Sequence, residues 1–188
     1  MTQEVLLVST SGLPKSEARH AIKVLEEKLG QIFSFRSSHA GVLPLGAYDN
    51  KRRQYAAEAF LSIAEDIRVK EKCVASLVLT EVDIFAASTN YVFGLADLER
   101  GVAVVSSHRI HPSFWGIVER RDFFETQWGK VVTHEFGHTV GLIHCQDWSC
   151  VMKFSNSPSE LYAKGTGFCK KCGIELQEVV TKLVEQRR

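Results

Sequence analysis

The stretch of residues 134–144 constrains this 188-residue chain more than any other part of its sequence. It contains His134, His138 and His144, and Glu135 directly follows the first of these histidines. Residues four apart on an α-helix lie about 40° apart around the axis and about 6 Å along it, so the first two imidazoles can point at one spot. The spacing therefore predicts a helix that carries two ligands for one metal ion.

The third histidine can join the other two only if the helix stops. In a continuing helix, His144 would lie about 15 Å along the axis from His134 and roughly 80° away from the shared face. Gly141 stands where the helix would end, and glycine tolerates the left-handed backbone conformation of many helix termini. We expect the chain to turn at this glycine and to bring His144 back to the other ligands.

Three neutral imidazoles leave a tetrahedral zinc ion with one open position for water, which is the arrangement of a catalytic site. Zinc lowers the pKa of bound water from about 16 to about 7, and Glu135 can take the proton as the water attacks a carbonyl. The His-Glu-x-x-His pattern alone also occurs by chance on amphipathic helices. Because Gly141 and His144 stand at the required offsets, we interpret the stretch as a catalytic zinc site.

Four cysteines follow the third histidine, and the last two form a Cys-x-x-Cys pair. Four thiolates suit a closed, structural zinc site. The alternatives are two disulfides, which conflict with the expected reducing compartment, and a thioredoxin-like redox pair, which lacks the preceding strand. The fifth cysteine, Cys73, is expected to be a small buried residue. The four predicted ligands of a second zinc ion are Cys145, Cys150, Cys169 and Cys172.

Composition and charge exclude several classes of partner. Hydrophobic residues make up 45% of the chain and charged residues 24%, and the net charge is +1. Nucleic acid is not an expected partner, because phosphate binding needs a basic face. No apolar run approaches the roughly 20 residues of a membrane span. Residues 1–10 carry Glu4 and no basic residue, unlike a signal peptide, so we expect a cytoplasmic protein, with a monomer favoured.

The apolar periodicity predicts an α+β fold, in which helices pack on a twisted mixed sheet. A helix over about 119–140 is apolar nearly all round and is expected to be central, with the zinc ligands near its end. We expect a single domain over residues 1–188, with an N-terminal subdomain to about 141 and a zinc-stabilised C-terminal subdomain over about 142–188. The other predicted helices are 16–29, 50–70 and 174–185, and the predicted strands are 5–8, 32–35, 74–80, 91–95 and 102–108.

Residues 134–172 resemble the archaemetzincins, a branch of the metzincin zinc metallopeptidases. The signature of that family is HExxHxxGxxH, directly followed by Cys-x4-Cys-x-Met and later by Cys-x-x-Cys, all of which occur here. The resemblance implies a metzincin-like fold, catalytic zinc on the three histidines, Glu135 as the base and a second zinc on the four cysteines. It also implies that Met152 is the Met-turn methionine beneath the zinc ligands.

Two further expectations come from this resemblance. Some metzincins have a tyrosine two residues after the methionine that helps to bind the metal or the transition state, and here Phe154 cannot do so. In metzincins an edge strand pairs with extended substrate, and by analogy residues 102–107 are expected to pair with a peptide. His108, Arg109 and His111 would then lie near one end of the cleft.

The resemblance implies a zinc-dependent peptidase that acts on peptides or proteins, and it suggests an aminopeptidase on short peptides. An aminopeptidase needs a group that captures the free amine, and Asp147, Asp122 and Glu119 are candidates that the spacing does not distinguish. The alternative from another class is a zinc-stabilised binding module with an intact but idle HExxH site. A third is a thiol redox protein. Glu135 favours the peptidase, because metal binding alone does not need a carboxylate there.

Overall fold

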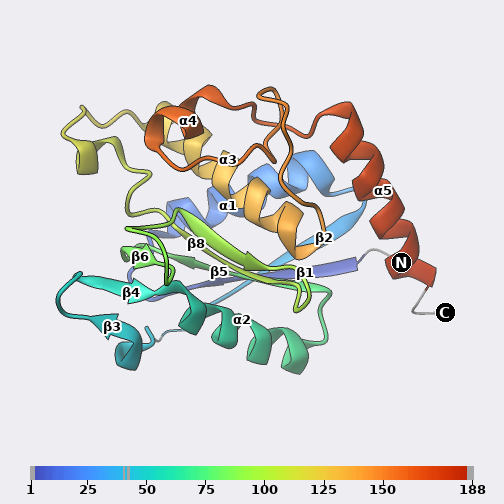
Figure 1. The fold of residues 1–188 in the computed structure, drawn as a ribbon. Coiled ribbons are helices and arrows are strands. Elements are labelled where there is room, and N and C mark those ends of the chain that lie inside the picture. Colours follow the sequence, from blue (N-terminus) through green and yellow to red (C-terminus); the bar gives the residue numbers. More distant parts are fainter. Residues whose placement is uncertain (1–2, 40, 42, 186–188) are drawn as a thin grey trace.

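The structure is a computed structural model that describes residues 3–39, 41 and 43–185. Helices cover both faces of a central mixed sheet, so the predicted fold class is confirmed (Figure 1). The strands are β1 (Gln3–Ser9), β2 (Phe33–His39), β3 (Tyr48–Asp49), β4 (Gln54–Ala56), β5 (Ala75–Thr80), β6 (Ile84–Phe85), β7 (Gly94–Asp97) and β8 (Val102–Ser106). The α-helices are α1 (Lys15–Leu29), α2 (Ala57–Glu71), α3 (Arg121–Thr139), α4 (Pro158–Ala163) and α5 (Lys170–Glu185).

The central sheet has the strand order β2-β1-β5-β8-β7. The first four strands run parallel, and β7 pairs with β8 in the antiparallel direction. Every residue of β5 and β8 is buried, because helices cover both faces of a parallel sheet. This burial accounts for the continuous apolar sequences of these strands. A smaller sheet of β3, β4 and β6 lies beside the central one.

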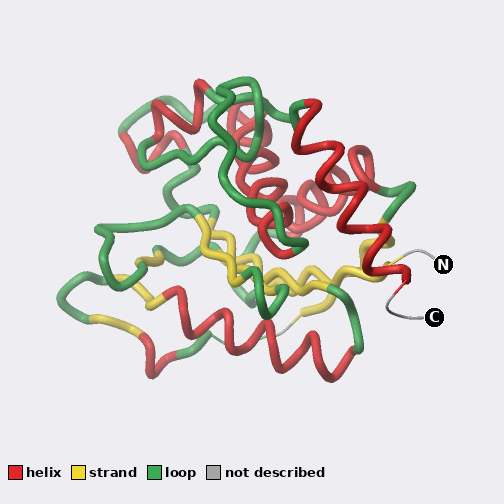
Figure 2. Tube along the Cα trace, turned by 45° about the vertical axis from the view of Figure 1, so that its right-hand side comes forward, coloured by secondary structure: helices red, strands yellow, loops and turns green. Residues whose placement is uncertain are grey.

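The helices form two layers, with α1 and α3 on one face of the sheet and α2 on the other (Figures 1 and 2). One apolar core joins α1 and α3 to the sheet, and a second core joins α2 to the opposite face. The Trp128 indole of α3 is fully buried and donates a hydrogen bond to the Glu17 carbonyl of α1 at 3.0 Å. No helix in the described part of the chain is long and apolar enough to cross a membrane.

Helix α3 is the central helix that the sequence predicted. Every residue from 127 to 139 is buried, so the helix has no solvent-facing stripe along this part. Such a helix is surrounded by protein on all sides. The sheet packs on one side, and the segments that follow the helix pack on the other (Figure 2). The first two predicted zinc ligands, His134 and His138, are therefore carried by a helix that is enclosed on all sides.

Two sequence-based predictions about elements are wrong. The helix expected over 50–70 begins only at Ala57, and Asn50 does not cap it. The preceding residues form β3 and β4, in which Tyr55 pairs with Ile84 and the Gln54 amide donates to the Asp83 carboxylate at 3.1 Å. These pairings join residues about thirty positions apart, and they outweigh the local helical propensity.

The strand expected to bind substrate is also not an edge strand. β8 lies between β5 and β7, so its backbone groups are already paired on both sides. The edge strand on this side of the central sheet is instead β7, which a tight turn joins to β8 in an antiparallel hairpin, and β2 is the edge strand on the other side. Helix α5 begins at Lys170, earlier than predicted, and the short helix α4 was not predicted.

Candidate active site

Helix α3 brings His134 and His138 together as the four-residue spacing predicts. Their Nε2 atoms lie 3.2 Å apart, and both side chains are buried. The Nδ1 atom of His134 contacts the Val151 carbonyl at 2.8 Å, and that of His138 contacts the Leu142 carbonyl at 2.7 Å. Because a carbonyl can only accept, each Nδ1 must carry the hydrogen, which leaves each Nε2 with a free lone pair for a metal.

A glycine turn returns the third histidine to this pair. Gly141 has a φ of +95°, its N–H donates to the His138 carbonyl at 2.9 Å, and the Leu142 N–H donates to the Gly137 carbonyl at 2.9 Å. These two bonds form a Schellman motif, which ends the helix at a left-handed residue. The His144 ring then lies 4.7 Å from the His138 ring and 5.3 Å from the His134 ring, between centroids.

The three histidines form a group that could hold a metal ion. One ligand atom from each lies within 4.8 Å of the others, without any rearrangement of the backbone. Burial lowers the pKa of all three imidazoles, so the neutral form that binds metal is favoured. Both the geometry and the donor chemistry therefore fit zinc.

Glu135 lies against the backbone of the neighbouring edge strand. A Cβ atom added at Gly94 would come 2.6 Å from both the Cγ and the Oε1 atoms of Glu135, so only a glycine leaves room for the carboxylate. Burial raises the pKa of Glu135 to about 8. The sequence analysis missed Gly94, although a glycine inside a strand often marks a close approach of other groups.

Met152 packs against α3, and Phe154 lies beside His144. Met152 is fully buried, and a Cβ atom added at Gly137 would come 2.5 Å from its sulfur, so the methionine packs directly on α3. The Phe154 ring lies 5.0 Å from the His144 ring, between centroids. A phenyl ring has no polar atom, so this position offers no hydrogen bond to a substrate.

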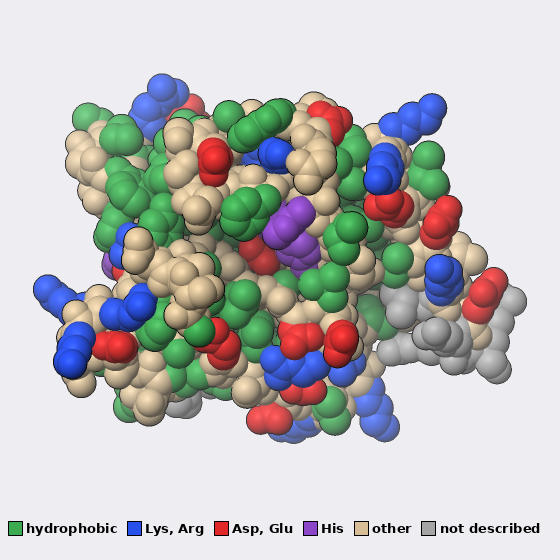
Figure 3. Space-filling view, in the orientation of Figure 1, with side chains coloured by type: hydrophobic (Ala, Val, Ile, Leu, Met, Phe, Trp, Pro, Cys, Tyr) green, Lys and Arg blue, Asp and Glu red, His purple; other side chains and the backbone are tan. Residues whose placement is uncertain are grey.

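The histidines open into a cleft of about 480 Å³. Figure 3 shows the histidine side chains in a hollow near the middle of one face, with apolar side chains around it. Strand β7 lines one side of the cleft, and the 154–164 segment lines another. Apart from the histidines, the charged residues that line it are Glu135 and Lys164.

Lys164 is a buried lysine that the sequence analysis did not assign to the cleft. Its side chain is 4% exposed, and its amine donates to the Lys153 carbonyl at 3.1 Å. The same nitrogen lies 3.3 Å from the Nδ1 atom of His134. Burial lowers the pKa of Lys164 to about 8. No pattern in the sequence distinguishes this lysine from a surface lysine, since its neighbours come from other elements.

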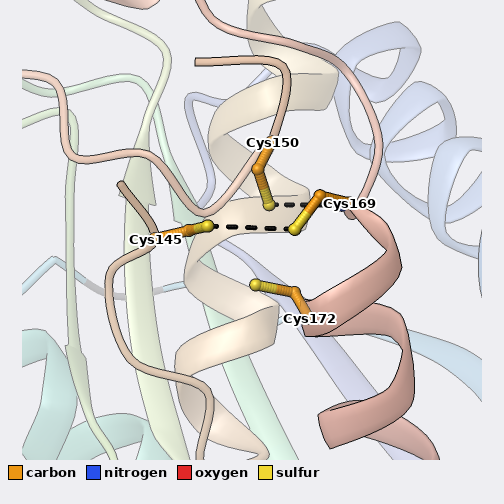
Figure 4. Close-up of side chains that lie close together, drawn as sticks. All are labelled: Cys145, Cys150, Cys169 and Cys172. Carbon is orange, nitrogen blue, oxygen red and sulfur yellow. Dashed lines mark hydrogen bonds between the residues drawn. The ribbon is translucent and has the colours of Figure 1, made fainter. Parts of the chain in front are cut away.

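The four cysteines of the predicted second site converge between the loop after α3 and the start of α5, and Figure 4 shows their side chains pointing toward one another. Their sulfur atoms all lie within 4.8 Å of one another, and Cys145 and Cys169 approach to 3.8 Å. All five cysteines are free thiols, and Cys73 is buried elsewhere, as expected. The redox and disulfide alternatives gain no support from this arrangement.

The other residues considered from the sequence lie outside the cleft and have structural partners. Arg109 forms two hydrogen bonds of 2.7 Å with Asp83, and the His108 ring bonds to the Glu81 carbonyl at 3.1 Å. None of the three candidates for amine capture lines the cleft. The three are Asp147, Asp122 and Glu119, which interact with Ser149, Arg120 and His111, respectively.

Comparisons with known proteins identify the family of this chain. Residues 41–178 match the profile of Peptidase family M54. The archaemetzincin of Pyrococcus furiosus is 39% identical over 142 residues, which cover 73% of this chain and 74% of that protein. The crystal structure of the archaemetzincin of Methanopyrus kandleri is 32% identical, with a TM-score of 0.82 over 96% of each chain. A zinc-dependent peptidase from Methanocorpusculum labreanum is 26% identical, with a TM-score of 0.78 over 92% of this chain and 99% of that one.

The fold, the histidine group and these relatives define the class of protein as a zinc metallopeptidase. Its substrates are accordingly peptides or proteins. The family match covers well over half of the chain, and the identity to P. furiosus archaemetzincin extends over nearly three quarters of it. The chain belongs to Peptidase family M54, the archaemetzincins.

Proposed function

We propose that His134, His138 and His144 hold the catalytic zinc and that Glu135 is the general base of peptide hydrolysis. The observation that carries the proposal is the convergence of the histidine ligand atoms beside the Glu135 carboxylate in one cleft. Zinc in this position would supply Lewis acidity, which polarises a carbonyl and lowers the pKa of water. The carbonyls of Val151 and Leu142 hold two of the rings in the tautomer that binds a metal.

Glu135 would accept a proton from the attacking water and return it to the leaving amine. Its carboxylate is packed against Gly94 and has little freedom to rotate away from the histidines. Burial raises its pKa to about 8 against the opposing effect of the Lys164 charge, and a cation held by the histidines would favour the ionised form that accepts a proton. The carboxylate is therefore both positioned and chemically suited for proton transfer.

The free edge of β7 would bind the substrate backbone. This strand forms the edge of the central sheet, lines the cleft and holds Gly94 against the base. An extended peptide could add to this edge as a further strand, which places a peptide bond beside Glu135. We therefore propose β7, in place of β8, as the strand that orients the substrate.

Cleavage profiling of a mixed peptide library tests the function. The wild-type protein would be compared with Glu135→Gln, after metal analysis has shown that both hold equal zinc. We expect cuts in the wild type and a loss of at least about a hundredfold in the variant, since general-base catalysis contributes about 10²–10⁴-fold. Equal and empty profiles would instead favour the alternative, a zinc-stabilised binding module with an idle site.

The same library tests aminopeptidase action on short peptides, which the resemblance suggests. Among the described residues, the base Glu135 is the only carboxylate in the cleft, so the structure offers no separate group for a free substrate amine. Trimming of single residues from the amino end would support an aminopeptidase. Cuts that are unaffected by acetylation of the amino end would exclude this form of the activity.

We also propose that Cys145, Cys150, Cys169 and Cys172 bind a second, structural zinc, giving two ions per chain. Four sulfurs within 4.8 Å of one another suit a closed tetrahedral site. This site would stabilise the C-terminal subdomain of about residues 142–188 within a single domain of 1–188. Thiolate ligands suit a reducing compartment, and we propose a cytoplasmic monomer that needs neither nucleic acid nor a membrane.

A further inference from the structure

Lys164 is a buried cation whose hydrogen-bonding capacity is only partly used. An ammonium group has three N–H donors, and the Lys153 carbonyl accepts one of them at 3.1 Å. The Nδ1 atom of His134 lies 3.3 Å away, but it already donates its own hydrogen to the Val151 carbonyl and cannot accept another. None of the ion pairs in the described part of the chain, which join a nitrogen and a carboxylate oxygen within 4.0 Å, includes the Lys164 amine.

A second buried lysine shows what a fully structural role looks like. Lys130 of α3 is also 4% exposed, but its amine donates to two carbonyls, those of Leu161 at 3.1 Å and Tyr162 at 2.9 Å. These carbonyls belong to the last turn of α4, so Lys130 ties that helix to α3. Lys130 does not line the cleft, whereas Lys164 does.

Burying an ammonium group is costly unless its N–H groups have partners. Glu135 is the only carboxylate among the described residues that lines the cleft, and it attracts Lys164 through its charge, but no hydrogen bond joins it to the amine. Glu135 is also needed as the base of the proposed mechanism. A ligand carboxylate would accept the unused N–H groups directly, next to the histidine group.

We propose that Lys164 binds a substrate carboxylate on the residue directly after the scissile bond. This inference rests on the proposed peptidase function and adds a substrate class to it. One imidazole ring, that of His134, separates the Lys164 amine from the converging Nε2 atoms. One residue of extended chain spans about 3.4 Å, so a group on the leaving residue can reach the amine while the scissile carbonyl lies at the histidines.

Two sources can supply this carboxylate: the carboxyl terminus of the substrate or an aspartate side chain. The test uses four peptides that share one cleavage site and differ only after the scissile bond. They carry a terminal alanine acid, a terminal alanine amide, an internal aspartate or an internal asparagine. We expect kcat/KM to be about tenfold or more higher for the acid than for the amide, or for the aspartate peptide than for the asparagine peptide. The reason is the charge-assisted hydrogen bond that the carboxylate makes. The pair that responds identifies the source.

Variants of the two buried lysines separate binding from folding. Lys164→Met and Lys164→Gln are expected to reduce the acid-to-amide or aspartate-to-asparagine ratio of kcat/KM to about one. The control Lys130→Met is expected to keep the wild-type ratio. Zinc content and melting temperature would be measured for each variant. A wild-type ratio of one would overturn the proposal. Lys164 variants that keep the wild-type ratio would also overturn it, including variants whose only change is a lower zinc content.

Binding calorimetry distinguishes failure of this inference from failure of the proposed function. Zinc-loaded Glu135→Gln would be titrated with the same acid and amide peptides, with and without Lys164→Met. Tighter binding of the carboxylate form that requires Lys164 supports the inference, even if the wild type cleaves nothing and the proposed function fails. Cleavage by the wild type, with equal affinity for both forms, would overturn the inference and leave the peptidase function standing.

Discussion

At the residue scale, the functional groups of the cleft are positioned by residues that take no part in the chemistry. The Val151 and Leu142 carbonyls set the tautomers of two histidines, and the absent side chain of Gly94 makes room for Glu135. Similarly, Met152 can pack on α3 only because Gly137 has no side chain. Small changes at such positions move a functional side chain without removing it.

Gly94→Ala is expected to lower kcat/KM by about ten- to a hundredfold at unchanged zinc content. The new Cβ atom would meet Glu135 at 2.6 Å, so the carboxylate must shift, and a displacement of about 1 Å can cost on the order of a hundredfold in rate. The matched control is Gly46→Ala, where the added methyl group meets no atom within 4 Å. Steady-state kinetics with metal analysis checks this, and wild-type activity in Gly94→Ala would contradict it.

At the scale of secondary structure, the end of α3 and the start of α1 are held by short, specific contacts. The Schellman turn at Gly141 both stops α3 and presents the Leu142 carbonyl to His138. On the far side of the helix layer, His111 stacks on Phe124 with ring centroids 4.0 Å apart. Its two nitrogens bond to Glu17 of α1 at 3.2 Å and to Glu119 at 3.3 Å.

The contribution of His111 to stability is expected to depend on pH. The hydrogen bond to Glu17 raises the pKa of His111 in the folded state above its unfolded value of about 6.5. The stabilisation is therefore fully present below about pH 6.5 and is lost as the pH rises through the raised value. Melting temperatures of the wild type and His111→Gln should differ more at pH 6 than at pH 9. A difference in melting temperature that stays constant or increases with pH would contradict this prediction.

At the scale of the whole molecule, the two groups of possible metal ligands join parts of the chain that share few other regular elements. Between α3 and α5, the only helix is the six-residue α4, and isolated bridges such as Cys150–Gly167 provide little further pairing. Helix α5 starts next to Cys169 and carries Cys172 (Figures 1 and 4). A metal on the cysteines would therefore tie the C-terminal segments to the loop after the active-site helix.

Cys169→Ser is expected to lose one zinc per chain and to lower the melting temperature by on the order of 10 °C, because metal-binding energy is folding energy. Cys73→Ser is the control, since this cysteine is buried, whereas Cys169 is half-buried, and it lies outside the cluster. Metal analysis and thermal unfolding of both variants check the prediction. Two zinc ions and an unchanged melting temperature in Cys169→Ser would rule out the second site.

The sequence by itself determined the features that depend on short spacings. The pair His134 and His138 and the turn at Gly141 follow from helix geometry and the conformational freedom of glycine, which are local properties. The pair Cys169 and Cys172 follows from the spacing of metal-binding cysteines. The central position of α3 also followed, since its apolar residues surround the whole helix. The family resemblance rested on these same residues.

Only the tertiary structure decided what depends on contacts between distant elements. The pairing of Tyr55 with Ile84 turned a predicted helix into strand β4, and the hairpin of β7 and β8 made β7 the edge. Likewise, Gly94 approaches Glu135, and Lys164 approaches His134, from segments far away in the sequence. No local propensity encodes such contacts, because the free energy that selects them comes from strand pairing and burial in the complete fold.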